Sequence, residues 1–142
     1  ISTNVGQAPK PLAKIISGGE ASRIMLAIKK VLLEIEKVPV IIFDEIDSGI
    51  SGKTASIVGK KLHEISRDKQ VICITHSPQI AAFGDYNYLI SKSSDDSNTY
   101  TNAKKLNSDE KINEIAKLIG GIHITENNII SAKELVENCK NF

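Results

Sequence analysis

The amino-acid sequence predicts an α/β fold, and three observations carry this prediction. Val40–Phe43 is an unbroken run of β-branched and aromatic residues, and Val71–Ile74 is a second apolar run of the same length. Patterns with helical spacing precede the first run and separate it from the second. Short, unbroken apolar runs are typical of strands covered on both faces, and strands that alternate with helices pair in parallel. We therefore expect mainly parallel central strands flanked by helices, followed by a C-terminal strand pair and further helices.

Length and composition indicate that residues 1–142 form one globular domain or one lobe of a larger domain. The net charge of +1 indicates neither a nucleic-acid surface nor a membrane surface, and no apolar stretch approaches the length of a membrane span. The chain begins at Ile1 and its single methionine is Met25, so we expect a piece of a longer protein. Cys73 and Cys139 lie far apart in the sequence, and we expect reduced thiols without a disulfide.

A helix is predicted to begin at the stretch Ser17-Gly18-Gly19-Glu20. Its apolar residues recur every three or four positions and define one face: Ala21, Ile24, Met25, Ile28, Val31, Leu32 and Ile35. Ser17 fits an N-cap, and Glu20 three residues later fits a capping box. Glycines at a helix start also leave backbone N–H groups free to meet an anion. A cap alone and a cap with a phosphate contact are both consistent with these residues.

Two acids, Asp44 and Glu45, follow the first predicted strand directly. Open α/β sheets bind ligands at the carboxyl edge of their strands, which is where these side chains would lie. Because successive side chains of a strand alternate in direction, one acid could hold a metal while the other meets a water molecule or substrate. The alternative is a polar strand end that leads into a glycine-rich turn.

A second amphipathic helix is predicted from Gly52 to about Arg67, with buried positions at Ala55, Val58, Leu62 and Ile65. Its start, Gly52-Lys53-Thr54, resembles the tail of a phosphate-binding P-loop. The pattern GxxxxGK[ST] requires glycine at position 47, where the chain has Asp47. No other stretch supplies this motif, so the sequence contains no P-loop.

His76 follows the second predicted strand, as the acid pair follows the first. In a parallel pair, His76 would lie beside the acids at the same edge, where it could donate a hydrogen bond to a phosphate oxygen. The alternative for a single histidine is a structural role. His63 and His123 lack this context and are expected at the surface or in packing.

The C-terminal part is predicted to hold a hairpin between helices. In order, we expect a short helix at Ser77–Phe83, strands at Tyr86–Ser91 and Thr99–Lys105 around a polar loop Lys92–Asn98, a helix ended by Gly120-Gly121, and a last helix at Glu126–Asn138.

The order SGGE, helix, IIFDEID, helix, ITH resembles the C-terminal half of a P-loop NTPase head of the ABC type. Ser17–Glu20 resembles the signature motif, Val40–Asp44 Walker B, Glu45 the catalytic glutamate and His76 the switch histidine. Glu20 and DEID are closer to the SMC-like branch than to transporter ATPases, which usually have glutamine and DEPT. Within that branch the chain resembles the RecN family of bacterial DNA double-strand-break repair ATPases, through KPLAKIISGGEASRIMLAIK, IIFDEIDSGISGKTA, ITHSPQIAAFGD and IAKLIGG.

The resemblance implies roles for the acids and the histidine. Asp44 would hold Mg²⁺, Glu45 would act as general base on the attacking water, and His76 would steady the γ-phosphate of ATP. Ser17–Gly19 would contact the ATP bound to an opposite head, with Glu20 capping the helix.

One position departs from the ABC pattern. Many ABC ATPases have an aspartate that closes the segment after Walker B, and this chain has Ser51 there. The contact across the dimer that this aspartate makes would then fall to Asp47 or Ser48.

The resemblance also implies partners: an N-terminal Walker A lobe and coiled coil of the same protein, a second head that sandwiches ATP, and DNA through the full-length protein. The protein would be cytoplasmic and nucleoid-associated, with no membrane. This lobe alone, without a P-loop, is expected neither to bind ATP tightly nor to hydrolyse it. The alternatives are a non-catalytic dimerisation or regulatory module with the same fold, and the C-terminal half of a transporter ATPase.

Overall fold

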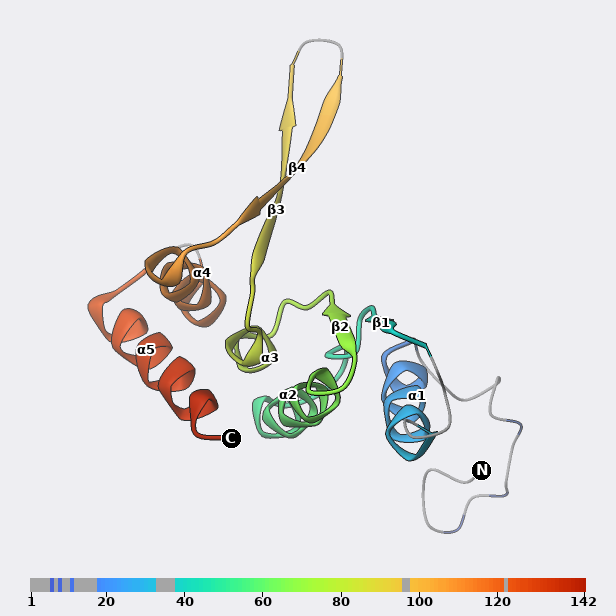
Figure 1. The fold of residues 1–142 in the computed structure, drawn as a ribbon. Coiled ribbons are helices and arrows are strands. Elements are labelled where there is room, and N and C mark those ends of the chain that lie inside the picture. The colour runs from blue at the N-terminus through green and yellow to red at the C-terminus, as the bar shows by residue number, and fades with distance from the viewer. Residues whose placement is uncertain are drawn as a thin grey trace.

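The computed structural model describes residues 6, 8, 11, 18–32, 38–95, 98–121 and 123–142. Helices and strands alternate in the first part of the chain, and a hairpin and two helices follow (Figure 1). The elements are α1 (Gly18–Leu32), β1 (Val40–Phe43), α2 (Gly52–Ser66), β2 (Gln70–Cys73), α3 (Pro78–Phe83), β3 (Tyr88–Ser94), β4 (Thr99–Lys105), α4 (Ser108–Gly120) and α5 (Glu126–Lys140). The predicted α/β class is confirmed.

β1 and β2 form the predicted parallel pair, with Val40 opposite Gln70 and Phe43 opposite Cys73. Pairing continues one step beyond the strands, because the Ile74 N–H donates to the Phe43 carbonyl at 2.9 Å. α2 makes the crossover between them. Since the strands are parallel, the residues that follow each strand leave from the same edge.

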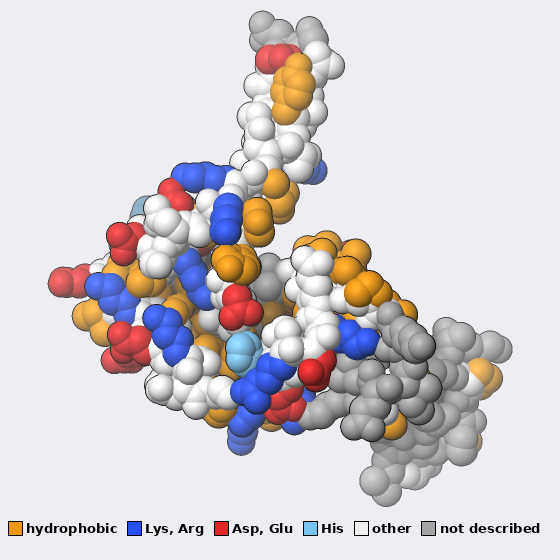
Figure 2. All heavy atoms as spheres, viewed as in Figure 1, with side chains coloured by type: hydrophobic (Ala, Val, Ile, Leu, Met, Phe, Trp, Pro, Cys, Tyr) orange, Lys and Arg blue, Asp and Glu red, His pale blue; other side chains and the backbone are white. Residues whose placement is uncertain are grey.

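The prediction that these strands are covered on both faces is wrong for the described part of the chain. Burial alternates along β1: Ile41 and Phe43 are buried, whereas Ile42 is 64% exposed. Ile72 and Ile74 are also exposed, and Figure 2 shows hydrophobic side chains gathered at the surface beside the β1–β2 pair. An unbroken apolar run predicts that both faces of a strand avoid water, but it does not identify the polypeptide that covers each face.

The first hydrophobic core lies on the other face of this strand pair. It joins α2 to β1 and the turn that follows β1, with one residue each from α1 and α3: Leu26, Ile41, Phe43, Ile46, Ala55, Val58, Leu62, Ile65 and Ile80. All four positions predicted to be buried in α2 belong to it. The predicted face of α1 does not, because Met25, Ile28 and Val31 are exposed, and it is Leu26 of that helix that packs into this core. Ile35 lies outside the described residues.

A second core joins α3, α4 and α5 through Ala82, Ile115, Ala116, Ala132, Val136 and Cys139. α4 and α5 each begin with a capping box, formed by Asn107 with Glu110 and by Thr125 with Asn128. These reciprocal hydrogen bonds satisfy N–H groups that a helix start leaves without partners. α5 extends two residues beyond the predicted end, to Lys140.

The β3–β4 hairpin is antiparallel and projects from the rest of the molecule (Figure 1). β3 starts at Tyr88, later than predicted. It also ends later, because Lys92–Ser94 pair with β4 and do not belong to the connecting loop. Both cysteines are free thiols, as expected. Within the described residues, no helix is both long enough and apolar enough to cross a membrane.

Candidate functional site

The carboxyl edge of the β1–β2 pair brings together the acid pair and the histidine, as the sequence predicted. Asp44 and Glu45 directly follow β1, and Thr75 and His76 follow the paired residue Ile74. The side chains of Asp44, Glu45 and His76 all face solvent. An exposed edge of this kind is where a parallel α/β sheet meets a ligand.

Glu45 has a left-handed backbone conformation, with φ +52°. This region is uncommon for a residue with a side chain and is found where surrounding contacts impose it. Here the Ser48 N–H donates to the Glu45 carbonyl at 3.0 Å and closes a turn. The turn directs the chain away from the strand immediately after Asp44, so Asp44 and Glu45 do not continue the alternation of β1.

The N-terminal part of α1 is hydrogen-bonded to the turn at residues 44–48. Ser22 Oγ donates to the Asp44 carbonyl at 3.0 Å. Arg23 Nη1 donates to the carbonyls of Ile46 at 3.1 Å and Ser48 at 2.8 Å. Gly19 is buried, and a Cβ at that position would lie 2.7 Å from Ser48 Cβ. Glycine is therefore required at position 19 by the close approach of helix and turn.

The structure describes only part of the stretch that resembles the signature motif. Gly18 and Gly19 begin α1 and Glu20 is exposed in its first turn, whereas Ser17 lies outside the described residues. The predicted cap by Ser17 is therefore untested and stays a prediction. The contacts of Ser22 and Arg23 were not predicted. Nothing in the sequence distinguishes a serine or arginine that binds a neighbouring turn from one on the solvent-exposed face of a helix.

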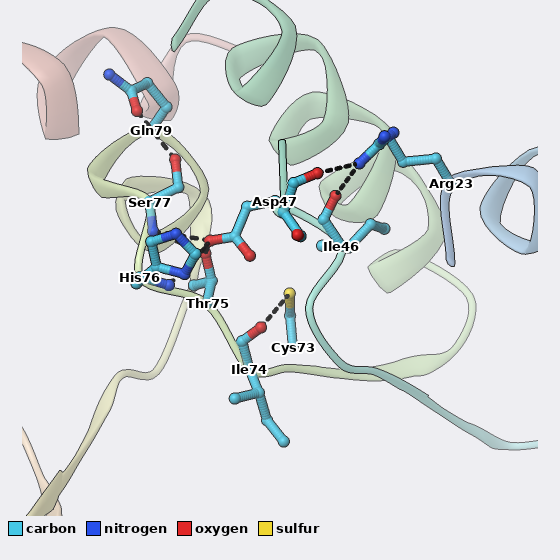
Figure 3. A network of polar contacts seen from close by, with 10 residues as sticks. Arg23, Ile46, Asp47, Cys73, Ile74, Thr75, His76, Ser77 and Gln79 are labelled. Carbon is cyan, nitrogen blue, oxygen red and sulfur yellow. Dashed lines mark hydrogen bonds and ion pairs between the residues drawn. The ribbon is translucent and has the colours of Figure 1, made fainter. Parts of the chain in front are cut away.

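Asp47 joins the turn after β1 to the segment after β2 (Figure 3). Only 5% of the residue is exposed. Its Oδ2 accepts hydrogen bonds from Thr75 Oγ1 at 2.5 Å and from the backbone N–H groups of His76 and Ser77, each at 2.9 Å. His76 Nδ1 lies 3.3 Å from the same oxygen, although the His76 side chain itself is 80% exposed.

The electrostatics of Asp47 follow from these contacts. Burial on its own would raise the pKa of the Asp47 carboxyl, but the hydrogen bonds from Thr75 and from the His76 backbone outweigh it, and the pKa is lowered. The carboxylate is thus held in its charged form. The sequence had suggested Asp47 or Ser48 for a contact across a dimer; in the structure Asp47 points into the lobe and Ser48 is half-buried beneath Gly19.

Cys73 lies next to this network, at the end of β2 (Figure 3). Burial, together with the negative charges of Asp47 and Asp44, raises the pKa of the Cys73 thiol to about 12. A thiol with so high a pKa is a poor nucleophile, so Cys73 is not a candidate catalytic residue.

A pocket of about 180 Å³ opens beside Asp47, between the starts of α2 and α3, with Gly52, His76 and Gln79 in its lining. It is smaller than the roughly 300–1,000 Å³ that drug-sized ligands usually occupy. The described residues also contain no group of three side chains able to hold a metal ion. The exposed polar edge of the strand pair thus lies beside a small pocket that Asp47 and His76 line.

Comparison with known proteins gives relatives at the level of sequence, although no family model matches the chain. Proteins called DNA repair protein RecN from Haemophilus influenzae and Bacillus subtilis are each 45% identical over 137 residues, which is 96% of this chain. The RecN of Streptomyces coelicolor is 37% identical over 140 residues. The chain spans about a quarter of the length of these curated relatives.

A solved structure is similar in fold. It comes from work on ATP-driven dimerisation and DNA-stimulated activation of SMC ATPases, and it aligns with a TM-score of 0.55 over 83% of this chain and 70% of its own. At 22% sequence identity this likeness concerns the fold alone. This likeness in fold agrees with the predicted α/β arrangement of helices around a parallel strand pair.

Proposed function

We propose, from the premise that this chain is an ATPase-head lobe of the RecN type, that it supplies part of an ATP-hydrolysing site in a longer DNA-repair protein. One observation carries the proposal. The start of α1, the turn at residues 44–48 and the segment at residues 75–77 meet at one edge of the parallel strand pair, joined by the hydrogen bonds of Ser22, Arg23 and Asp47. These three segments are the ones that the sequence likens to the signature motif, Walker B and the switch histidine.

Glu45 is the proposed general base. Its carboxylate is exposed at the strand end, where it can accept a proton from a water molecule that attacks a phosphate. The left-handed turn at Glu45 and the hydrogen bond from the Ser48 N–H hold the backbone of this residue in one conformation. A base held in this way loses little conformational freedom when substrate arrives.

Asp44 is the proposed ligand for Mg²⁺. Mg²⁺ in phosphoryl-transfer sites keeps several waters and takes one or two carboxylates together with substrate phosphates, so a single exposed carboxylate fits it and a cluster of protein ligands is not needed. The ion would neutralise phosphate charge when bound. The Asp44 carbonyl, tied to Ser22 Oγ, holds this residue against α1.

His76 is proposed to contact the γ-phosphate through Nε2. Nδ1 faces Asp47, so Nε2 on the opposite side of the ring is the nitrogen left for an outside partner. The N-terminus of α1, with Ser17, Gly18 and Gly19, is proposed to face the ATP of a second head, where its N–H groups and dipole favour a phosphate; Glu20 would cap the same helix.

The exposed apolar surface supports a partner from the same protein. Val40, Ile42, Ile72 and Ile74 expose apolar side chains on one face of the strand pair, and such contiguous patches mark interaction surfaces. We propose that an N-terminal lobe with the P-loop covers this face, with a coiled coil between the lobes. Two such heads would sandwich ATP, and hydrolysis would release them. DNA would be bound by the full-length protein, in the bacterial cytoplasm at the nucleoid.

The test is ATP turnover by the full-length protein with Glu45→Gln. General-base catalysis typically contributes about 10²–10⁴-fold, so turnover should fall by at least about a hundredfold while ATP-dependent head dimers persist. Glu134→Gln is the matched control, since Glu134 is exposed on α5, far along the chain from this edge. Unchanged turnover in Glu45→Gln would remove Glu45 from the site. A wild-type protein that dimerises with ATP without turnover would favour the non-catalytic module.

A further inference from the structure

Asp47 is the one charged side chain that is buried in the described part of the chain. Removing a carboxylate from water is unfavourable unless hydrogen-bond donors replace the lost solvation. Three donors converge on Oδ2, whereas Oδ1 is buried without a partner among the described residues. The acid is turned toward the segment after β2, whereas Asp44 and Glu45, which precede it closely in the chain, are exposed.

These contacts join two segments that the fold places on neighbouring strands. Asp47 lies two residues after Glu45, in the turn that Ser48 closes. Its partners Thr75, His76 and Ser77 follow β2, about 30 residues further along the chain. A displacement of either segment would break hydrogen bonds to a charged acceptor, which are among the stronger hydrogen bonds in proteins. The turn and the segment are therefore held in a common position.

The same carboxylate orients the His76 ring. His76 Nδ1 lies 3.3 Å from Asp47 Oδ2, and the backbone N–H of His76 donates to the same oxygen. Because the side chain is otherwise 80% exposed, the ring is held on its Nδ1 side only. A carboxylate beside one imidazole nitrogen sets which nitrogen faces the outside partner. Without it, either ring nitrogen could face outward.

We propose that Asp47 is a positioning residue that orients His76 and couples the segment after β2 to the turn that carries Glu45. This inference rests on the proposed function, because it assigns the two coupled residues to one ATP site. It differs from the role suggested for Asp47 by the sequence, which was a contact with a second head. Asp47 touches no nucleotide in this scheme and acts through His76 and the shared turn.

The experiment combines hydrogen exchange and steady-state kinetics on the full-length protein. Asp47→Asn removes the negative charge. Either the amide NH₂ or the amide carbonyl of the asparagine then occupies the position of Oδ1, which has no hydrogen-bond partner among the described residues. Loss of a hydrogen bond to a charged group corresponds to a change of about tenfold to a hundredfold. We expect the backbone amides of His76 and Ser77 to exchange at least about tenfold faster without nucleotide, while exchange in α4 and α5 stays unchanged. We also expect kcat to fall at least about tenfold with KM changed less than about threefold.

Two controls separate positioning from a loss of folding. Asp68→Asn removes an exposed carboxylate in the turn after α2 and should leave exchange and kcat unchanged. Thr75→Val removes one donor to Asp47 with nearly the same shape, and Thr75→Ser restores it. Valine should reproduce the faster exchange and lower kcat, and serine should reverse them, a rescue that a purely structural role of the Thr75 methyl group would not produce.

The proposal is overturned if Asp47→Asn and Thr75→Val match Asp68→Asn in both exchange and kcat. If Asp47→Asn unfolds globally, exchange in α4 and α5 will also be faster. In that case the comparison of Thr75→Val with Thr75→Ser decides whether Asp47 positions His76. A wild-type protein without ATP turnover would contradict the proposed function. The exchange data would still decide whether Asp47 couples the two segments.

Discussion

Gly19→Ala tests whether the start of α1 is held tightly against the turn at residues 44–48. The added Cβ would lie 2.7 Å from Ser48 Cβ, 2.8 Å from the Ser48 carbonyl oxygen and 3.0 Å from the Glu45 carbonyl oxygen. Two of these three atoms are backbone, so no side-chain rotation relieves the overlap. Either α1 or the turn must move by several tenths of an ångström.

The expected cost can be assembled from three contributions. Overpacking of this kind costs about 1–3 kcal/mol. Moving α1 also weakens the hydrogen bonds of Arg23 to Ile46 and Ser48, and a hydrogen bond to a charged group contributes about 1.5–3 kcal/mol when intact. Alanine gains up to about 1 kcal/mol over glycine in a helix. The free energy of unfolding should therefore fall by about 2 kcal/mol, a large part of the usual stability of a domain.

Gly52→Ala is the matched control for this measurement. Gly52 also lies in the first turn of a 15-residue helix, but its added Cβ would meet the end of the Gln79 side chain, with Nε2 at 3.1 Å. That side chain can move, so we expect a change within about 0.5 kcal/mol. Urea unfolding of this chain, followed by far-UV circular dichroism, compares the two variants. Equal losses in both would refute the close contact between helix and turn.

Two further predictions follow from the ionisable groups around the site. Because the pKa of the Cys73 thiol is raised from 9.0 to about 12, its thiolate fraction in mildly alkaline buffer should be about a thousandfold below that of an unperturbed thiol. Iodoacetamide should modify Cys73 only after unfolding in urea, and rapid labelling of Cys73 in the native protein, located by peptide mass spectrometry, would contradict the raised pKa of this half-buried thiol. The pKa of Asp47 is lowered in the folded state, so its contribution to stability is present above the unfolded value near 3.8 and is lost as pH falls through the lower folded value. Acid unfolding should be less steep in Asp47→Asn than in wild type, and superimposable acid curves would show that Asp47 is not selectively stabilised as the anion.

The candidate site was predictable from the sequence where it depends on strand ends. Val40–Phe43 and Val71–Ile74 were recognised as strands because β-branched runs of this length have few other structures available, and parallel pairing then places Asp44, Glu45 and His76 at one edge. The parallel pairing and shared edge are confirmed. The roles of these three residues stay proposals.

Contacts that depend on side-chain direction were not predictable. Arg23 reaches carbonyls 23 and 25 residues away, and Asp47 reaches donors 28–30 residues away. Nothing in the local pattern distinguishes Asp47, which is buried, from Asp44, which is exposed, although both belong to the same DEID stretch. Burial of a charge requires several donors at once, and these come together only when the two strands pair.

By itself, the sequence determined the order of the elements, the apolar face of α2 and the edge at which the polar residues emerge, because local periodicity and strand direction are properties of the chain. The tertiary structure alone decided that Gly19 touches Ser48, that Asp47 faces inward to Thr75 and His76, and that Ile42 and Ile72 are exposed on one face. These outcomes depend on which segments meet in space. An apolar or acidic side chain encodes its need for a partner and not the identity of that partner.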